Sequence, residues 1–190
     1  MEHLCEFHEV HSLPPPLPHQ PLPFLTHWSP PWHAPFKINF NGALFKDIST
    51  IGLGVAIQDC RGEVIGAMSE RIVLPFSVEE VEALACSKAL LLAREIGITK
   101  ADVEGDSAVV INFLNLGSSC LAGCGHVIED LKAVEKAFSF ISFSHVRCTG
   151  NLVAQRLARK DKSLLEPHFW LENVLEDISP CVTRDKALIQ

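Results

Sequence analysis

Two acidic side chains and one amide would meet at a single point if the elements that carry them are neighbours. Asn41 and Asp106 each come where an expected strand ends, and Glu82 lies on the apolar stripe of an expected helix. A glutamate on such a stripe is unusual unless it has a partner. Clustered carboxylates repel one another, and Mg²⁺ or Mn²⁺ relieves that repulsion while activating water. The chemistry to consider is metal-dependent hydrolysis of a phosphodiester.

The elements that must position these residues follow from periodicity and turn signals. Alternation of apolar residues predicts strands at 36–43, 51–59, 63–72, 99–104 and 139–147. Helical spacing predicts helices at 78–96, 108–116, 126–138 and from 149 to about 162. A meander of three strands followed by alternating strands and helices predicts an α/β domain, with a mixed five-stranded sheet and helices on both faces.

The helix at 78–96 decides which glutamate joins the cluster. Ser77 is expected to cap it, with Glu80 completing a capping box. Helical geometry places Glu82 on the core-facing stripe, whereas Glu79 and Glu80 are expected to point away. Asp106 has a simpler alternative role, because it precedes an expected helix and would serve as its N-cap.

Composition limits the partners that this chain can bind. The 190 residues, 47% of them hydrophobic, suit one domain with some length left over. The net charge is −7, so nucleic-acid binding would have to come from a local patch and would be weak and salt-sensitive. One basic cluster is visible, and it is equally well explained as phosphate contacts or as a solvated helix face: Arg147, Arg156, Arg159, Lys160 and Lys162.

The two ends of the chain differ from its middle. Residues 1–27 form a proline-rich leader that is expected to be disordered, with a ligand for a proline-binding module as the alternative. Residues 165–190 form a C-terminal extension with apolar residues at helical spacing. A short docking helix is expected there, and a partner-binding helix is the alternative. The residues at this spacing are Trp170, Leu171, Val174, Leu175 and Ile178.

Targeting signals and cysteine usage indicate a compartment only coarsely. No secretory signal and no membrane-spanning run is visible, which predicts a soluble intracellular protein without membrane contact. Seven scattered cysteines do not suggest a disulfide framework. Cys120, Cys124 and His126 lie close together, but a zinc site would need a fourth ligand at sensible spacing, so free thiols are the better interpretation.

Five motifs in order resemble the plant reverse-transcriptase-like ribonuclease H family, over about residues 28–160. Each motif alone is weak, but five with family-like spacing are strong, and the lead-in Trp28–Trp32 adds to them. The motifs are KINFNGA at 37–43, GLGVAIQD at 52–59, VEALA at 81–85, VEGDS at 103–107, and HVRCTGN at 145–151 followed by VAQRLA at 153–158.

This resemblance implies a ribonuclease H-like fold at residues 28–164, with strand order 3-2-1-4-5. It also implies RNA–DNA hybrid ribonuclease activity by two Mg²⁺ or Mn²⁺ ions. The family's four acidic positions fall on Asn41, Glu82, Asp106 and Gln155, so two of the four carboxylates are amides here. Asn41, Glu82 and Asp106 would be the metal ligands. Hydrolysis is therefore expected to be much reduced or absent.

The resemblance also indicates how nucleic acid would bind. His145, Arg147, Asn151 and Arg156 would contact an RNA/DNA hybrid or a structured RNA, and the protein is expected to be a monomer. Two alternatives remain. One is an active metal-dependent ribonuclease that tolerates Asn41. The other is a retroelement-derived interaction module without nuclease activity.

Overall fold

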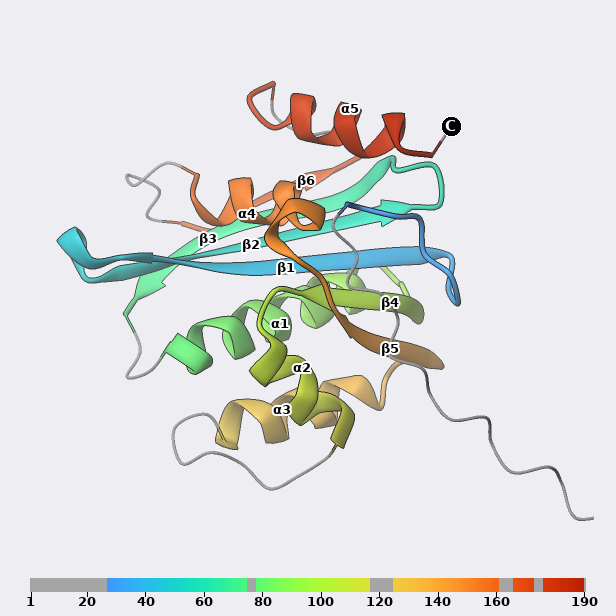
Figure 1. Cartoon of the computed structure of the whole chain (residues 1–190). Helices are drawn as coiled ribbons and strands as arrows, with labels where there is room; N and C mark the ends of the chain where they lie inside the picture. The colour runs from blue at the N-terminus through green and yellow to red at the C-terminus, as the bar shows by residue number, and fades with distance from the viewer. Residues whose placement is uncertain (1–26, 75–77, 117–124, 161–165, 173–175, 190) are drawn as a thin grey trace, which may run out of the picture.

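The computed structural model describes residues 27–74, 78–116, 125–160, 166–172 and 176–189. A single sheet crosses the molecule with helices on both sides (Figure 1). All but the last residue of the proline-rich leader lies outside the described residues, as do Ser77, Cys120 and Cys124.

The sheet is mixed and has six strands in the order β5-β4-β1-β2-β3-β6. Its first three strands form an antiparallel meander, β4 and β5 continue parallel to β1, and β6 pairs antiparallel with β3. The predicted order 3-2-1-4-5 is confirmed, and β6 is added at the edge beyond β3. The strands are β1 (Phe36–Phe45), β2 (Thr50–Asp59), β3 (Val64–Val73), β4 (Lys100–Gly105), β5 (Phe140–His145) and β6 (His168–Leu171).

The predicted placement of helices on both faces is also confirmed (Figure 1). One face carries α1 (Val78–Glu95), α2 (Ala108–Leu116) and α3 (Gly125–Glu135). The other carries α4 (Leu152–Ala158) and α5 (Ser179–Ala187). Two short 3₁₀ turns complete the chain path, η1 (Lys46–Ile48) after β1 and η2 (Cys148–Gly150) before α4.

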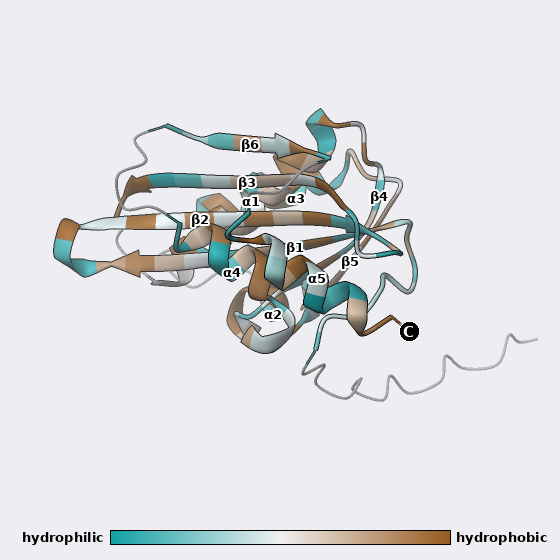
Figure 2. Ribbon diagram, turned by 90° about the horizontal axis from the view of Figure 1, so that it is seen from above, coloured by the Kyte–Doolittle hydropathy of each residue, from teal (hydrophilic) through white to brown (hydrophobic). Residues whose placement is uncertain are grey.

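The apolar core is divided unequally between the two faces. Alternate residues of a strand point to opposite faces, so Ile38 and Phe40 of β1 pack with α1 in the larger core. Only a small apolar cluster lies under α4 and α5, around Ala56, Val153 and Leu157. In Figure 2, hydrophobic colour runs along the central strands, whereas α5 is hydrophilic over much of its length. The second face therefore has room for polar side chains on the sheet itself.

Two glycines let α4 lie directly on the sheet. A Cβ at Gly52 would be 1.9 Å from the carbonyl oxygen of Ala158, and one at Gly54 would be 2.1 Å from that of Ala154. No side chain can be accommodated at such a distance. The GLG segment of β2 thus fixes how closely α4 approaches the strands that carry the candidate site.

Two local predictions were wrong. Trp170 and Leu171 lie in β6 rather than in a helix, and the C-terminal helix α5 begins only after Ile178. The apolar spacing in this segment reflects docking against β3 and α4, and Val174 and Leu175 lie outside the described residues. Glu80 does not point away from the protein.

The glutamate at position 80 is 8% exposed, and one of its carboxylate oxygens lies 3.8 Å from His126 Nε2. His126 therefore lies on α3 beside an acid of α1, and the two cysteines considered with it, Cys120 and Cys124, lie outside the described residues. The four cysteines in the described part of the chain are free thiols: Cys60, Cys86, Cys148 and Cys181. No helix within the described ranges is long and apolar enough to cross a membrane.

Candidate functional site

The predicted meeting of Asn41 and Asp106 follows from the pairing of β1 with β4. The parallel register sets Asn39 opposite Glu104 and Phe40 opposite Gly105, so the next residues of both strands leave the sheet side by side. Asn41 is 4% exposed, and its Nδ2 donates a hydrogen bond of 2.9 Å to Asp106 Oδ1. An amide thus occupies the position nearest to the Asp106 carboxylate.

Glu82 reaches the same point from the opposite face of the sheet, at the second turn of α1. The backbone N–H of Gly42 lies 3.2 Å from both carboxylate oxygens of Glu82 and donates to them. A Cβ at Gly42 would be 2.5 Å from Val81 Cγ1, so only glycine lets α1 come this close. Burial and, to a smaller extent, the negative charge of Asp106 raise the pKa of Glu82 to about 8, although the Gly42 hydrogen bond acts in the opposite direction.

Asp106 is not the N-cap of α2, because Ser107 takes that role. The Ser107 hydroxyl oxygen accepts a hydrogen bond from the Val110 N–H at 3.4 Å. The Asp106 carboxylate instead faces the site, where Oδ2 accepts from the Cys148 thiol at 3.1 Å. That hydrogen bond is the first cause of a raised pKa at Cys148, followed by burial and by the negative charge of Asp106.

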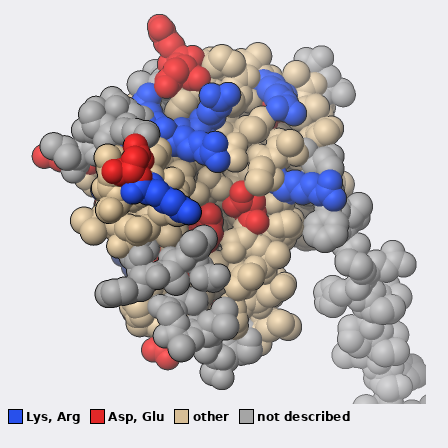
Figure 3. Space-filling model, turned by 60° about the vertical axis from the view of Figure 1, so that its left-hand side comes forward, with Lys and Arg blue, Asp and Glu red and all other residues tan. Residues whose placement is uncertain are grey.

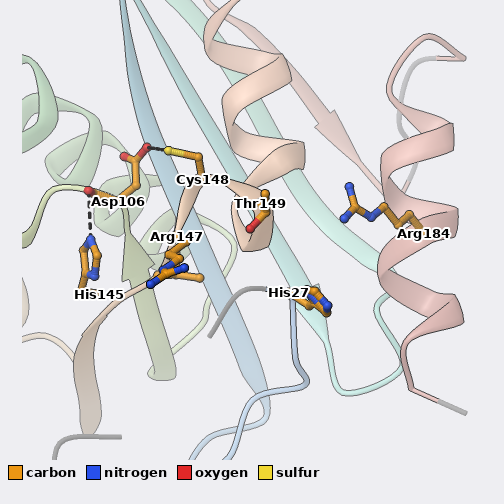
Figure 4. Close-up of a pocket in the computed structure, with 8 residues that line it drawn as sticks. His27, Asp106, His145, Arg147, Cys148, Thr149 and Arg184 are labelled. Atoms are coloured by element: carbon orange, nitrogen blue, oxygen red, sulfur yellow. Dashed lines mark hydrogen bonds between the residues drawn. The ribbon is translucent and has the colours of Figure 1, made fainter. Parts of the chain in front are cut away.

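A pocket of about 610 Å³ opens beside Asp106. Figure 4 shows the carboxylate and Cys148 on one side of it, with His27 and Arg184 of α5 on the other. The ring Nε2 of His145 lies 3.2 Å from the backbone oxygen of Asp106. We name this cavity the Asp106 pocket; its lining residues are His27, Asp106, His145, Val146, Arg147, Cys148, Thr149 and Arg184.

Two of the residues predicted to bind nucleic acid, His145 and Arg147, line the Asp106 pocket, while Asn151 does not. Asn151 is 1% exposed, and its Nδ2 donates to the Phe40 carbonyl oxygen at 2.8 Å. This bond ties the start of α4 to β1, so the structure gives Asn151 an internal role instead of the expected surface contact.

Gln155 and Arg156 lie elsewhere, in a second pocket of about 680 Å³ on the outer face of α4. The structure therefore brings together three of the four predicted active-site residues and places Gln155 in a separate pocket.

The sequence did not predict a buried ion pair between Lys37 of β1 and Glu104 of β4, which lies on the same two strands as the site but further into the sheet. Lys37 is fully buried, and its Nζ lies 2.6 Å from Glu104 Oε1. Ser29 Oγ accepts from the same ammonium at 3.2 Å, and Asn39 Nδ2 donates to Glu104 Oε2 at 3.4 Å. Polar residues at alternate positions of both strands were the available signal, because period two places them on one face.

The lead-in to β1 is held by the other acid of β4, Asp102. The backbone N–H groups of Trp32 and His33 donate to Asp102 Oδ2 at 2.7 and 2.9 Å, and Ser142 Oγ donates to Oδ1 at 2.7 Å. Burial alone would raise the pKa of Asp102, but these hydrogen bonds hold it below its usual value. Nothing in the sequence pattern indicated His27 or Arg184 as pocket residues, since both reach the site from outside the recognised motifs.

Comparison with known proteins establishes the fold. A family model described as reverse transcriptase-like matches residues 39–161. Comparison with curated proteins found no match. The N-terminal RNase H domain of Rv2228c from Mycobacterium tuberculosis has a TM-score of 0.60 at 20% identity, over 65% of this chain and 90% of that one. RNase H1 from Halobacterium salinarum has a TM-score of 0.61 at 20% identity, over 66% and 95%.

A further similar structure is LC11-RNase H1 in complex with an RNA/DNA hybrid. It has a TM-score of 0.60 at 17% identity, over 66% of this chain and 94% of that one. At these identities the likeness extends to the fold, which is the ribonuclease H-like fold expected from the motifs.

Proposed function

The chain belongs to the reverse transcriptase-like family, and from that premise we propose that it binds nucleic acid through its ribonuclease H-like domain but cleaves it weakly or not at all. Weak or absent cleavage is inferred from the hydrogen-bond donors that surround the two remaining carboxylates, Asp106 and Glu82. Protein groups donate to both oxygens of Asp106 and to both oxygens of Glu82.

The residues present do not fit a pair of divalent ions. Mg²⁺ favours ionised, hard oxygen ligands and must compete with whatever holds them. Asn41 carries no charge, and a pKa of about 8 favours the protonated form of Glu82 at neutral pH. Within the described ranges, no group of three or more His, Cys, Asp or Glu side chains is placed to hold a metal ion. This arrangement supports a site whose hydrolytic chemistry is impaired.

The binding half of the proposal is supported by the groups around the Asp106 pocket. Arg147 and Arg184 bring positive charge to its rim, and His145 adds a ring that can stack or donate. Figure 3 shows Lys and Arg side chains gathered in the upper part of one face, with acidic side chains below them near its centre. The hybrid bound to LC11-RNase H1 makes an RNA/DNA hybrid the first ligand to test.

The test measures cleavage and binding with the same labelled RNA/DNA hybrid. Cleavage in Mg²⁺ or Mn²⁺ is expected to stay at the level of an Asp106→Asn variant, while fluorescence anisotropy shows binding that weakens steeply with salt. Robust metal-dependent cleavage by the wild-type chain, absent in Asp106→Asn, would establish the active ribonuclease instead.

A second candidate function is favoured by the charge of the chain. A net charge of −7 is unusual for a nucleic-acid binder, and it suits an interaction module that has kept the fold without the ligand. The anisotropy measurement separates the two, because such a module would bind neither hybrid, duplex RNA nor single strands at low salt.

A further inference from the structure

The outer face of α4 carries a second pocket that the predicted active site does not use. Three residues of α4, Leu152, Gln155 and Arg156, and the two residues that follow the helix contribute to it, and those of α4 are spaced so that they lie on one side of the helix. The opposite side of α4 is buried against the sheet. We name this cavity of about 680 Å³ the α4 pocket; its lining residues are Leu152, Gln155, Arg156, Arg159, Lys160, Asp177 and Ile178.

The charge of the α4 pocket is positive but partly masked. Arg156 and Arg159 are exposed, and their guanidinium groups offer the planar donors that match a phosphate. Lys160 is different, because its Nζ lies 2.8 Å from Asp177 Oδ2. The Lys160 side chain is 19% exposed and that of Asp177 61% exposed, so the carboxylate covers the ammonium from the solvent side. Asp177 thus neutralises part of the positive charge of the α4 pocket.

The two pockets lie along the same helix. Thr149, which lines the Asp106 pocket, lies shortly before α4, and the first residue of α4, Leu152, lines the α4 pocket. The helix of seven residues is roughly 10 Å long at 1.5 Å per residue. That length corresponds to about three nucleotides of one strand in a duplex, at 3.4 Å each. The C-terminal segment contributes to both cavities, through Arg184 to the first and Asp177 to the second.

We propose that the α4 pocket binds phosphodiester groups of a nucleic-acid strand that also enters the Asp106 pocket, and that Asp177 is a built-in competitor for the phosphate. The inference rests on the proposed nucleic-acid binding. A phosphate that enters the pocket displaces the Asp177 carboxylate from Lys160 and contacts Arg156 and Arg159. The C-terminal segment, which lies beyond the matched residues 39–161, thereby weakens binding in this chain.

The test is a gain of binding on removal of the competitor. Asp177→Asn is expected to tighten binding of a labelled RNA/DNA hybrid by about fivefold at 0.1 M salt and to steepen the plot of log K against log salt by about 0.9, the value for one more phosphate contact. The matched control is Glu63→Gln, which makes the same charge change in the exposed Lys186–Glu63 pair. If both variants tighten hybrid binding equally, the gain comes from the change in net charge alone, and the proposal is overturned.

The converse variant removes the two arginines. Arg156→Gln with Arg159→Gln is expected to lower the salt slope by about 1.8, since two contacts are lost. NMR signals of the two guanidinium groups should shift when the hybrid is added to the wild-type chain. Hybrid binding without these shifts, or an unchanged slope, overturns the α4 pocket and leaves the proposed function standing. A wild-type chain that binds no hybrid overturns both.

Discussion

Two polar clusters lie next to each other on β1 and β4, and they differ in one respect. The inner cluster consists of Lys37, Asn39 and Glu104, and the outer cluster consists of Asn41, Asp106 and, from α1, Glu82. The inner cluster pairs one ammonium with one carboxylate. The outer cluster brings two carboxyl groups together with an amide and no cation.

That difference separates a structural role from a chemical one. Inside the sheet, the charges balance and the ion pair needs no further ligand. At the strand ends, the charges do not balance, and the pKa of Glu82 rises to about 8 through burial and the charge of Asp106. Strong perturbation of a carboxyl group is a mark of functional sites. Both clusters contain carboxyl and amide side chains. The balance of charge is therefore the feature that distinguishes the structural cluster from the candidate functional one.

Breaking the inner cluster should have the largest effect. Lys37→Met leaves Glu104 buried without its cation, and removing one partner of a buried pair costs about 3–5 kcal/mol of the free energy of unfolding. Urea denaturation measures this loss. The double variant Lys37→Met with Glu104→Gln should recover much of it, because no charge is then left unpaired. A loss below about 1 kcal/mol would contradict the balanced pair.

The outer cluster should make the free energy of unfolding depend on pH. The folded-state pKa of Glu82, about 8, lies above its ordinary value of 4.5, so folding takes up a proton between these values. The free energy of unfolding therefore falls as pH rises through this window. Glu82→Gln should remove the slope, and its advantage over the wild type should grow by about 2 kcal/mol between pH 6.5 and 8.

Asp185 provides the control for this pH dependence. Burial raises its pKa to about 6, even though Gln58, Arg184 and Lys37 act to lower it. Its contribution has the same sign but fades about one pH unit above its pKa, so Asp185→Asn should change the slope mainly below about pH 7. Urea denaturation at pH 5, 6.5 and 8 separates the two groups. A Glu82→Gln variant that keeps the wild-type slope above pH 6.5 would contradict the assignment.

The same chemical change in both clusters sharpens the comparison. Asn41→Asp adds a third carboxylate to the outer cluster and removes the hydrogen bond to Asp106, at a cost of about 1–3 kcal/mol without metal. With Mg²⁺ at 10 mM and a Kd of about 1 mM, about 1.4 kcal/mol should return. Thermal unfolding with and without Mg²⁺ measures this recovery, and titration calorimetry measures the binding.

Asn39→Asp is the matched variant in the inner cluster. It places a carboxylate beside Glu104 and should destabilise the protein without any response to Mg²⁺, because all three members of the inner cluster are buried and Trp28 and Ser29 contact Lys37. A response to Mg²⁺ at both positions, or at neither, would remove the distinction between the clusters.

The part of the fold that periodicity specifies was predictable. Five strands and all the helices up to α4 follow from apolar alternation, helical stripes and glycine signals, whereas the order of the strands was implied by the family resemblance. β6 was missed because its four residues are too few to show a period, and their apolar side chains match a helical spacing equally well. Whether so short a segment forms a strand or a helix depends on tertiary structure. Here the edge of β3 is available for pairing, so the segment forms a strand.

The candidate site was predictable where one strand pairing decides it. Asn41 and Asp106 meet because β1 and β4 are parallel neighbours, and Glu82 joins them because of its place on α1. The partners of Asp106 were not predictable, since Cys148, His27 and Arg184 depend on how the loop after β5 and the C-terminal helix fold over the sheet. Gln155 was assigned by motif alone, and it faces the α4 pocket because the helix rotation sets its direction.

The smallest expected effect tests the contact that closes the outer cluster. The Cys148 thiol donates to Asp106 Oδ2, and this bond raises the pKa of the thiol. Because the thiolate is the nucleophile, Asp106→Asn should lower that pKa and speed alkylation of Cys148 by iodoacetamide at pH 8 a few-fold, on the order of 3-fold. Mass spectrometry follows each cysteine separately, and the rate at the exposed Cys60 should not change. An unchanged rate at Cys148 would mean that the Asp106 carboxylate is open on that side and available to a ligand, which would bring the outer cluster closer to a working metal site.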